Sequence, residues 1–179
     1  WVFLALRIVT LLWMGHLSGA IPYFDKLNNV VPNYLSQNKF LDHYILSPWC
    51  RWDALFYMEI SSEGYSSQLP SVVWPPLFPF LIRVVNKIFN NPALSSLVVS
   101  NISALVAFYL IYQLITETIS EPVAKKSIQL LAIFPTSFFL VAGYSESLFL
   151  VFVAGFFLTL RRNNPLLGGV LYGLAVLTR

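Results

Sequence analysis

Long apolar segments constrain this chain more than any other feature of its sequence. Residues 94–115 contain no charged side chain, and about 20 such residues in a helix are enough to cross the hydrocarbon core of a bilayer. Of the 179 residues, 57% are hydrophobic and 11% are charged, whereas a soluble domain carries about 25% charged residues. A fold of this length could not bury so much apolar surface in water, so part of it is expected to face lipid.

Further apolar runs predict an all-α, polytopic transmembrane bundle of about five spans. The expected spans are residues 1–21, 94–115, 127–142, 147–160 and 163–178. The sequence begins at Trp1 and stops directly after an apolar run, so we expect it to be the N-terminal part of one transmembrane domain. The sequence thus predicts a multi-pass integral membrane protein.

The segment between the first two expected spans, residues 22–93, is rich in charged, aromatic and proline residues. A loop of this length is usually functional or contains structure of its own. Two amphipathic helices are predicted within it, at 51–62 and 77–89, lying in the membrane interface. The basic pairs at 125–126 and 161–162 indicate cytoplasmic loops, which places residues 22–93 outside. Basic residues within the long segment favour the opposite orientation, but loops beyond about 60 residues carry little weight in this rule.

Asp53 is the first candidate for chemistry, because it lies beside Trp52 in a predicted interfacial helix. A carboxylate at a membrane surface is partly desolvated, which raises its pKa and suits it to act as a general base. The same pattern also fits a helix whose Trp and Tyr side chains, such as Tyr57, form an aromatic belt. The residues alone leave both interpretations open.

Glu146 is the second candidate, because it stands between two apolar runs near the expected bilayer boundary. An ionisable residue at that depth indicates a functional site. Alternatively, it marks a helix start at which Ser145 or Ser147 caps the helix and the helix dipole favours the carboxylate. These two interpretations are compatible.

Several kinds of site are not indicated. The single cysteine, Cys50, and the residue spacings show no zinc site, phosphate-binding glycine loop or Ser-His-Asp triad, so we expect neither a metal nor a cofactor. The net charge of +3 comes from scattered residues, which predicts contact with anionic membrane lipids and no nucleic-acid partner.

A series of short motifs from residue 51 to residue 179 resembles one family in its order. The motifs are Arg-Trp-Asp-x-x-x-Tyr at 51–57, Glu-Gly-Tyr at 63–65, Pro-Pro-Leu-Phe-Pro at 75–79, Phe-Pro-Thr-Ser at 134–137, Gly-Tyr-Ser-Glu-Ser at 143–147 and Leu-Thr-Arg at 177–179. Their order is similar to that of the second mannosyltransferase of GPI-anchor assembly and its prokaryotic relatives. These enzymes belong to the GT-C class of multi-spanning glycosyltransferases.

The resemblance implies a mannosyltransferase that takes its sugar from a polyprenyl- or dolichyl-phosphate donor by direct inverting displacement. Asp53 would be the catalytic base, and Glu146 a second acidic residue in the next outer loop. Because the phosphate is already a good leaving group, no strong general acid is required. Arginine pairs well with phosphate, so Arg51 and Arg179 are the expected cations. The other expected substrate-binding residues are Trp52, Tyr57 and Tyr144.

The acceptor, a lipid, a glycan or a protein, stays open, and Trp74-Pro75-Pro76 is closer to the prokaryotic branch of the family. The membrane would be the plasma membrane in a prokaryote and the endoplasmic reticulum in a eukaryote. Two other classes fit the composition. A lipid or sugar transporter or flippase would usually show internal repeats, and the sequence shows none. A structural membrane subunit would tolerate alanine at Asp53.

Overall fold

The computed structural model describes residues 8–9, 12, 46, 49–65 and 73–179. Within these residues the chain forms helices and no strand, which confirms the all-α prediction for this part. The helices are α2 (Asp53–Glu63), α3 (Leu77–Phe89), α4 (Pro92–Thr118), α5 (Glu121–Ile133), the 3₁₀ helix η5 (Pro135–Leu140), α6 (Glu146–Arg161) and α7 (Pro165–Val176). The predicted first span, residues 1–21, lies almost entirely outside the described residues.

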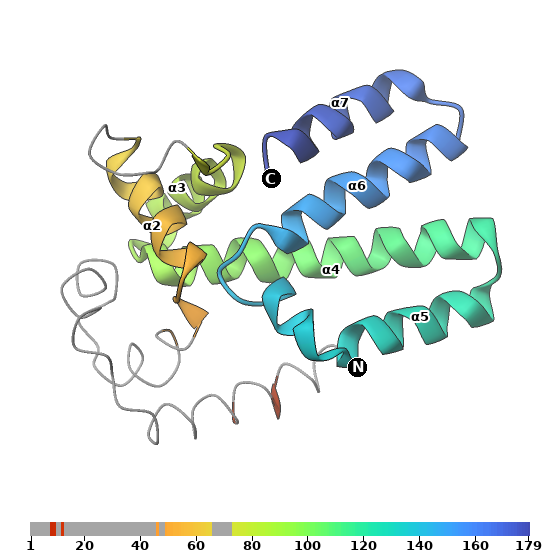
Figure 1. Cartoon of the computed structure of the whole chain (residues 1–179), viewed down its shortest axis with the longest axis horizontal. Coiled ribbons are helices and arrows are strands. Elements are labelled where there is room, and N and C mark those ends of the chain that lie inside the picture. The colour runs from red at the N-terminus through yellow and green to blue at the C-terminus, as the bar shows by residue number, and fades with distance from the viewer. Residues whose placement is uncertain (1–7, 10–11, 13–45, 47–48, 66–72) are drawn as a thin grey trace.

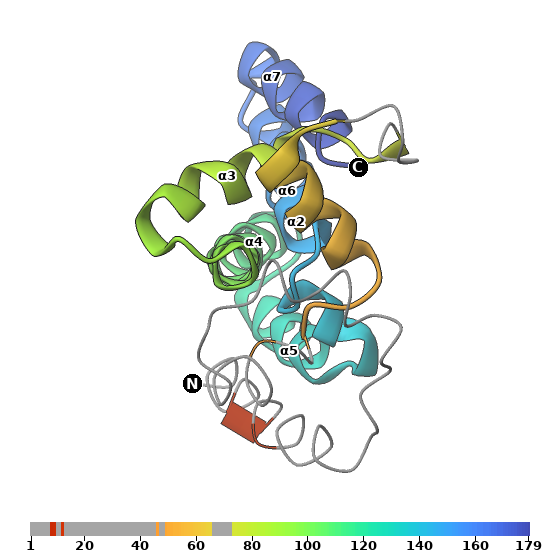
Figure 2. The same cartoon turned by 90° about the vertical axis from the view of Figure 1, so that its left-hand side faces the viewer.

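The long helix α4 is the centre of the arrangement. Helices α5 and α6 pack on it, and α7 packs on the other side of α6, so that four helices lie side by side (Figure 1). Helices α2 and α3 cross the end of this layer where α4 begins, as Figure 2 shows from the side. The starts of α4 and α6 and the ends of α5 and α7 therefore meet near α2 and α3.

Helix starts follow the expected local chemistry. The Asn91 side chain accepts a hydrogen bond from the Leu94 N–H (2.9 Å), and Pro92 occupies the first turn of α4. Asn164 does the same for the Leu167 N–H (3.2 Å) at the start of α7. An Asn cap followed by a proline satisfies exposed N–H groups and fixes φ for the first turn.

The predicted third span, residues 127–142, is not one helix. Helix α5 starts at Glu121, where a Glu121–Lys125 ion pair of 2.6 Å links successive turns, and it ends at Ile133. Phe134 is extended (φ −65°, ψ 135°), as a residue before proline usually is, and Pro135 then begins η5. A proline lacks the N–H needed to continue α5, so the apolar run is divided there.

One helix in the described part, α4, is long and apolar enough to cross a membrane, and α7 is a shorter apolar helix. The five-span bundle is not confirmed and stays a prediction. Large apolar side chains on these helices nevertheless point outward: Tyr109 of α4 is 60% exposed and Leu166 of α7 is 82% exposed. A surface of this kind favours a lipid-facing environment.

Candidate active site

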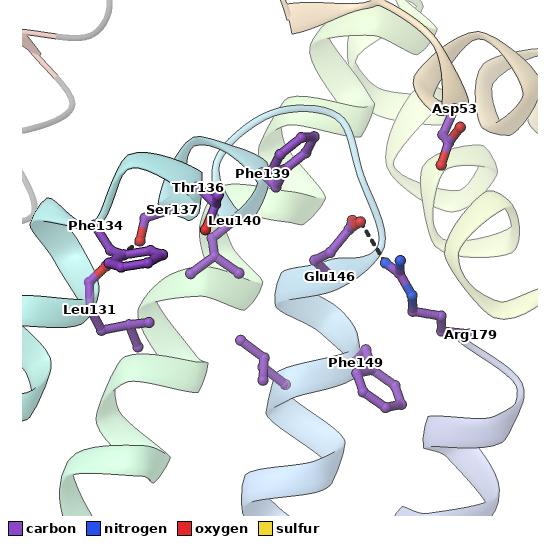
Figure 3. A pocket seen from close by; sticks show the side chains of 11 residues that line it. Asp53, Leu131, Phe134, Thr136, Ser137, Phe139, Leu140, Glu146, Phe149 and Arg179 are labelled. Atoms are coloured by element: carbon purple, nitrogen blue, oxygen red, sulfur yellow. Dashed lines mark hydrogen bonds and ion pairs between the residues drawn. The ribbon is translucent and has the colours of Figure 1, made fainter.

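A cavity of about 620 Å³ lies between α2, η5 and the start of α6 (Figure 3). Three ionisable side chains, Asp53, Glu146 and Arg179, line it. The rest of its wall is made by two hydroxyl-bearing residues and six apolar ones: Thr136, Ser137, Leu131, Phe134, Phe139, Leu140, Phe149 and Leu150. The cavity therefore combines a charged end with an apolar wall.

Asp53 is the first residue of α2, and its carboxylate points toward the side of the cavity where Arg179 lies (Figure 3). Burial raises the pKa of Asp53, and the negative charge of Glu146 raises it further, while the positive charge of Arg179 opposes both. A carboxylate with raised proton affinity inside a cavity suits proton abstraction.

The residue before Asp53 has an unusual backbone. Trp52 has φ of 49° and ψ of −120°, in the left-handed half of φ space that a bulky residue rarely adopts. Its indole is 66% exposed and does not line the cavity. Such strain persists only where the surroundings fix it, and it is often found at functional sites.

Glu146 and Arg179 form an ion pair, with 2.5 Å between Oε1 and Nη1 (Figure 3). The hydrogen bond to Glu146 raises the pKa of Arg179, so the guanidinium stays charged. The other carboxylate oxygen of Glu146, Oε2, is buried and has no hydrogen-bond partner among the described residues. A buried acceptor of this kind is costly unless a ligand hydroxyl or water reaches it.

The helix-cap interpretation of Glu146 is only partly right. Glu146 does occupy the first turn of α6, where the helix dipole favours a carboxylate. Neither neighbouring serine caps that helix through its side chain, because the Ser145 hydroxyl pairs with that of Tyr57 (2.9 Å) and Ser147 donates to the Ser100 carbonyl (2.9 Å).

Arg179 reaches the cavity because the end of α7 is tied to the start of α3. The Leu77 N–H donates to the Leu177 carbonyl (3.0 Å), and Thr178 is fully buried. The turn at Pro75 and Pro76 leads into this contact, so the proline-rich motif helps to place the guanidinium.

The remaining predicted site residues do not line the cavity. Tyr57 and Tyr144 are each 3% exposed. Their hydroxyls bond within the protein, Tyr57 with Ser145 and Tyr144 with the backbone carbonyl of Arg51. The structure thus brings together Asp53, Glu146 and Arg179, whereas Arg51, Trp52, Tyr57 and Tyr144 are not among the residues that line the cavity, and their predicted substrate-binding role stays a prediction.

The apolar wall was not predicted from the sequence. Phe149 and Leu150 follow Glu146 by three and four residues, and this spacing places them on the same face of a helix. The Phe134-Pro135-Thr136 motif supplies the opposite wall. Both signals were present in the sequence. In the described ranges, no three His, Cys, Asp or Glu residues are grouped closely enough to hold a metal ion.

Residues 73–179 match the model of a family of membrane glycosyltransferases, so the chain belongs to that class of enzyme. That family is described as dolichyl-phosphate-mannose-protein mannosyltransferase, and the match covers more than half of the chain, so the chain belongs to it. The matched residues include Glu146 and Arg179 and begin after Asp53. No curated protein and no solved structure matches the chain. The predicted membrane glycosyltransferase class is confirmed, and the match does not single out the second mannosyltransferase of GPI-anchor assembly.

Proposed function

We propose that the protein is a multi-pass GT-C mannosyltransferase that transfers mannose from a polyprenyl- or dolichyl-phosphate donor to an extracytoplasmic hydroxyl group. The observation that carries the proposal is the cavity in which Asp53 faces the Glu146–Arg179 ion pair, with an apolar wall beside them. Such a cavity offers a base for the acceptor, a cation for the phosphate and an apolar surface for the lipid.

The reaction needs one proton acceptor and one charge partner. The acceptor oxygen attacks C1 of mannose while the bond from C1 to the phosphate oxygen breaks, and the electron pair leaves with the phosphate. Asp53 takes the acceptor proton, and the anomeric configuration inverts because attack and departure occur on opposite faces. Positioned proton transfer contributes about 10²–10⁴-fold to such a step.

Arg179 is the favoured partner of the departing phosphate. Its guanidinium lines the cavity and is already held by Glu146, and the remaining N–H groups of a planar guanidinium can bind phosphate oxygens. Arg51 was the other predicted cation, and its side chain does not line the cavity. We therefore assign the phosphate to Arg179, without a metal ion.

The acceptor is proposed from two sources. The matched family name implies a protein hydroxyl, while the motif order resembles an enzyme that mannosylates a glycolipid. The two acceptors share the same chemistry, an alcohol that attacks C1. The membrane is the plasma membrane in a prokaryote or the endoplasmic reticulum in a eukaryote, and the cavity faces away from the cytoplasm.

The test is mannose transfer by membranes containing the protein, with labelled polyprenyl-phosphate-mannose as donor and a chelator present. Asp53→Asn keeps the shape of the side chain and cannot accept the proton, so we expect transfer to fall by at least about 100-fold. Glu59→Gln is the control, because Glu59 lies on the same helix and does not line the cavity. It should transfer at the wild-type rate.

Two results would count against parts of the proposal. Wild-type transfer by Asp53→Asn would remove Asp53 as the base and leave the transferase activity in place. Movement of a lipid-linked sugar across the membrane, with no transfer from any donor, would favour the transporter or flippase class. Loss of transfer on chelation would refute the metal-free mechanism alone.

A further inference from the structure

Two buried tyrosines connect α2 to the segment that leads into α6. One tyrosine belongs to α2 and bonds to that segment, and the other belongs to the segment and bonds to the residues before α2. The Tyr57 hydroxyl, from α2, lies 2.9 Å from Ser145 Oγ. The Tyr144 hydroxyl donates to the Arg51 carbonyl at 3.0 Å. Each bond therefore joins one element of the cavity to the other.

Both bonds lie close in sequence to the two cavity carboxylates, Asp53 and Glu146. Residues 51 and 57 stand on either side of Asp53, and residue 57 is one helical turn beyond it. Residues 144 and 145 directly precede Glu146, the first residue of α6. The two bonds thus join residues that are close in sequence to each carboxylate, one through the Arg51 backbone carbonyl and the other between two side chains.

We propose that Tyr57, Tyr144 and Ser145 are positioning residues that hold the Asp53 carboxylate in register with the Glu146–Arg179 pair. This proposal rests on the proposed function, and it replaces the expectation that the two tyrosines bind substrate. Their hydroxyls act through Asp53 and touch no substrate.

The segment before Glu146 is itself fixed on the central helix α4. Ser100 Oγ donates to the Tyr144 carbonyl (3.0 Å), and Ser147 Oγ donates to the Ser100 carbonyl (2.9 Å). The next residue of α4, Asn101, donates from its side-chain amide to the Val141 carbonyl (3.0 Å). Because α4 holds this segment from one side, the two tyrosines transmit its position to α2.

This network explains the Gly-Tyr-Ser-Glu-Ser motif residue by residue. Gly143 lies so close to α4 and α2 that a Cβ would meet Ser96 Oγ at 2.7 Å and Ala54 Cβ at 3.4 Å. Tyr144 and Ser145 bond to the two sides of Asp53, Glu146 enters the cavity, and Ser147 bonds to α4. A motif that looked like a helix cap is an arrangement of contacts around the cavity.

Tyr→Phe substitutions at positions 57 and 144 remove the hydroxyl hydrogen bonds and keep the packing of the aromatic rings. The Tyr57 ring makes edge contacts with Trp74 and Phe78, at centroid distances of 5.3 and 4.9 Å, and phenylalanine would retain them. The Tyr144 ring likewise contacts Phe139 at 5.4 Å. Loss of the hydrogen bond alone should therefore leave the fold intact and loosen α2.

The experiment measures steady-state mannose transfer by Tyr57→Phe, Tyr144→Phe and Ser145→Ala in membranes, with polyprenyl-phosphate-mannose as donor. A carboxylate displaced by about 1 Å can cost about 100-fold, so we expect kcat to fall by about 10- to 100-fold with KM for the donor little changed. Tyr172→Phe is the matched control, because that ring is 59% exposed on α7. The double variant Tyr57→Phe/Ser145→Ala should lose no more than either single variant, since both remove one bond.

A pH profile separates positioning from a general loss of folded protein. Glu146 and Arg179 are the charged groups whose fields reach Asp53, and burial is the main cause of its raised pKa. A loosened α2 admits water, which lowers that pKa, so the acid limb of kcat should move to lower pH. A smaller amount of folded enzyme would lower the measured activity equally at every pH and would leave the pH of the acid limb unchanged.

Four outcomes decide between the proposals. Wild-type kcat in both Tyr→Phe variants, with Asp53→Asn inactive, overturns the positioning roles and leaves the base in place. A rise in KM with unchanged kcat would show that the hydroxyls bind substrate, and a fall in kcat with an unmoved acid limb would show a structural role. If Asp53→Asn is fully active, Asp53 is not the base and the positioning roles fail with it, whereas the proposed function itself fails only if the wild-type protein transfers no mannose.

Discussion

Gly143→Ala tests the packing that the whole cavity depends on. Gly143 is buried where the segment before α6 crosses α4, and its added Cβ would lie 2.7 Å from Ser96 Oγ. The two further neighbours, Ser96 Cβ and Ala54 Cβ, would be in ordinary contact at 3.4 Å. The serine hydroxyl is therefore the atom that must move.

The cost follows from what Ser96 Oγ does in the native structure. It donates to the Ala93 carbonyl at 2.8 Å, and turning it away loses a hydrogen bond worth about 0.5–1.5 kcal/mol. Adding a methyl group to a packed interior costs about 1–3 kcal/mol when the surroundings must shift. For a protein of this size, 1 kcal/mol lowers Tm by about 2–4 °C, so Gly143→Ala should lower Tm by about 2–12 °C.

The assay is thermal unfolding of the purified protein in detergent, followed by tryptophan fluorescence. Ser96→Ala removes the clashing atom, so Gly143→Ala/Ser96→Ala should unfold at a higher temperature than Gly143→Ala, with a coupling energy of about 1–2 kcal/mol. Gly169→Ala on α7 is the control, because a Cβ there meets nothing within 4 Å. It should hold or raise Tm, since alanine is the better helix former by about 1 kcal/mol.

If Gly143→Ala unfolds at the wild-type temperature, the added Cβ does not displace Ser96 Oγ. If the variant is destabilised and Ser96→Ala does not restore it, the cost has another origin. Mannose transfer by the same variants gives a second readout. A displaced segment before Glu146 should lower kcat along with Tm, and Ser96→Ala should restore both.

Two other predictions concern titration and helix capping. In the proposed mechanism Asp53 acts in its deprotonated form, so activity should rise with pH through the pKa of that group. Because Glu146 raises this pKa and Arg179 lowers it, the acid limb should move to lower pH in Glu146→Gln and to higher pH in Arg179→Gln. A pH–rate profile of each variant checks this, and shifts of the same sign would contradict it. Asn91→Ala should lower the free energy of unfolding by about 1 kcal/mol, because the buried cap on the Leu94 N–H is lost. Thermal unfolding should then show a Tm lower by about 2–4 °C, and an unchanged Tm would show that the cap does not stabilise α4.

The fold was largely predictable wherever local chemistry marks the helix ends. The helix at Leu77–Phe89 has the predicted bounds, because prolines precede it and Asn90 ends it in a left-handed conformation. Around Lys125 and Pro135 the apolar pattern was misleading. Two lysines looked like a loop although the Glu121 ion pair supports a helix there, and the apolar content of 127–142 concealed a proline that ends it.

The site was predictable in its charges and not in its contacts. Asp53, Glu146 and Arg179 stood out because charges are rare in such a chain, and the structure places all three on one cavity. The substrate-binding role predicted for Tyr57 and Tyr144 stays a prediction, because sequence proximity to Asp53 does not show in which direction a side chain points. Tyr57 shares a helix with Asp53 but points into the packing between α2 and α6, where its hydroxyl meets Ser145.

The arrangement of charge along α4 links the site to the orientation of the protein. At the Thr118 end, Glu117 pairs with Arg162 at 2.5 Å and with Arg161, which brings the ends of α4 and α6 together. Helix α6 has 16 residues and extends about 24 Å, so Arg161 at its end lies about that far from Glu146 and the cavity at its start. If the arginine-rich end faces the cytoplasm, as the positive-inside rule favours, the cavity opens on the opposite side. Under the proposed function, a lipid-phosphate donor in that leaflet would place its headgroup beside Asp53 and Arg179 and its tail along the apolar wall.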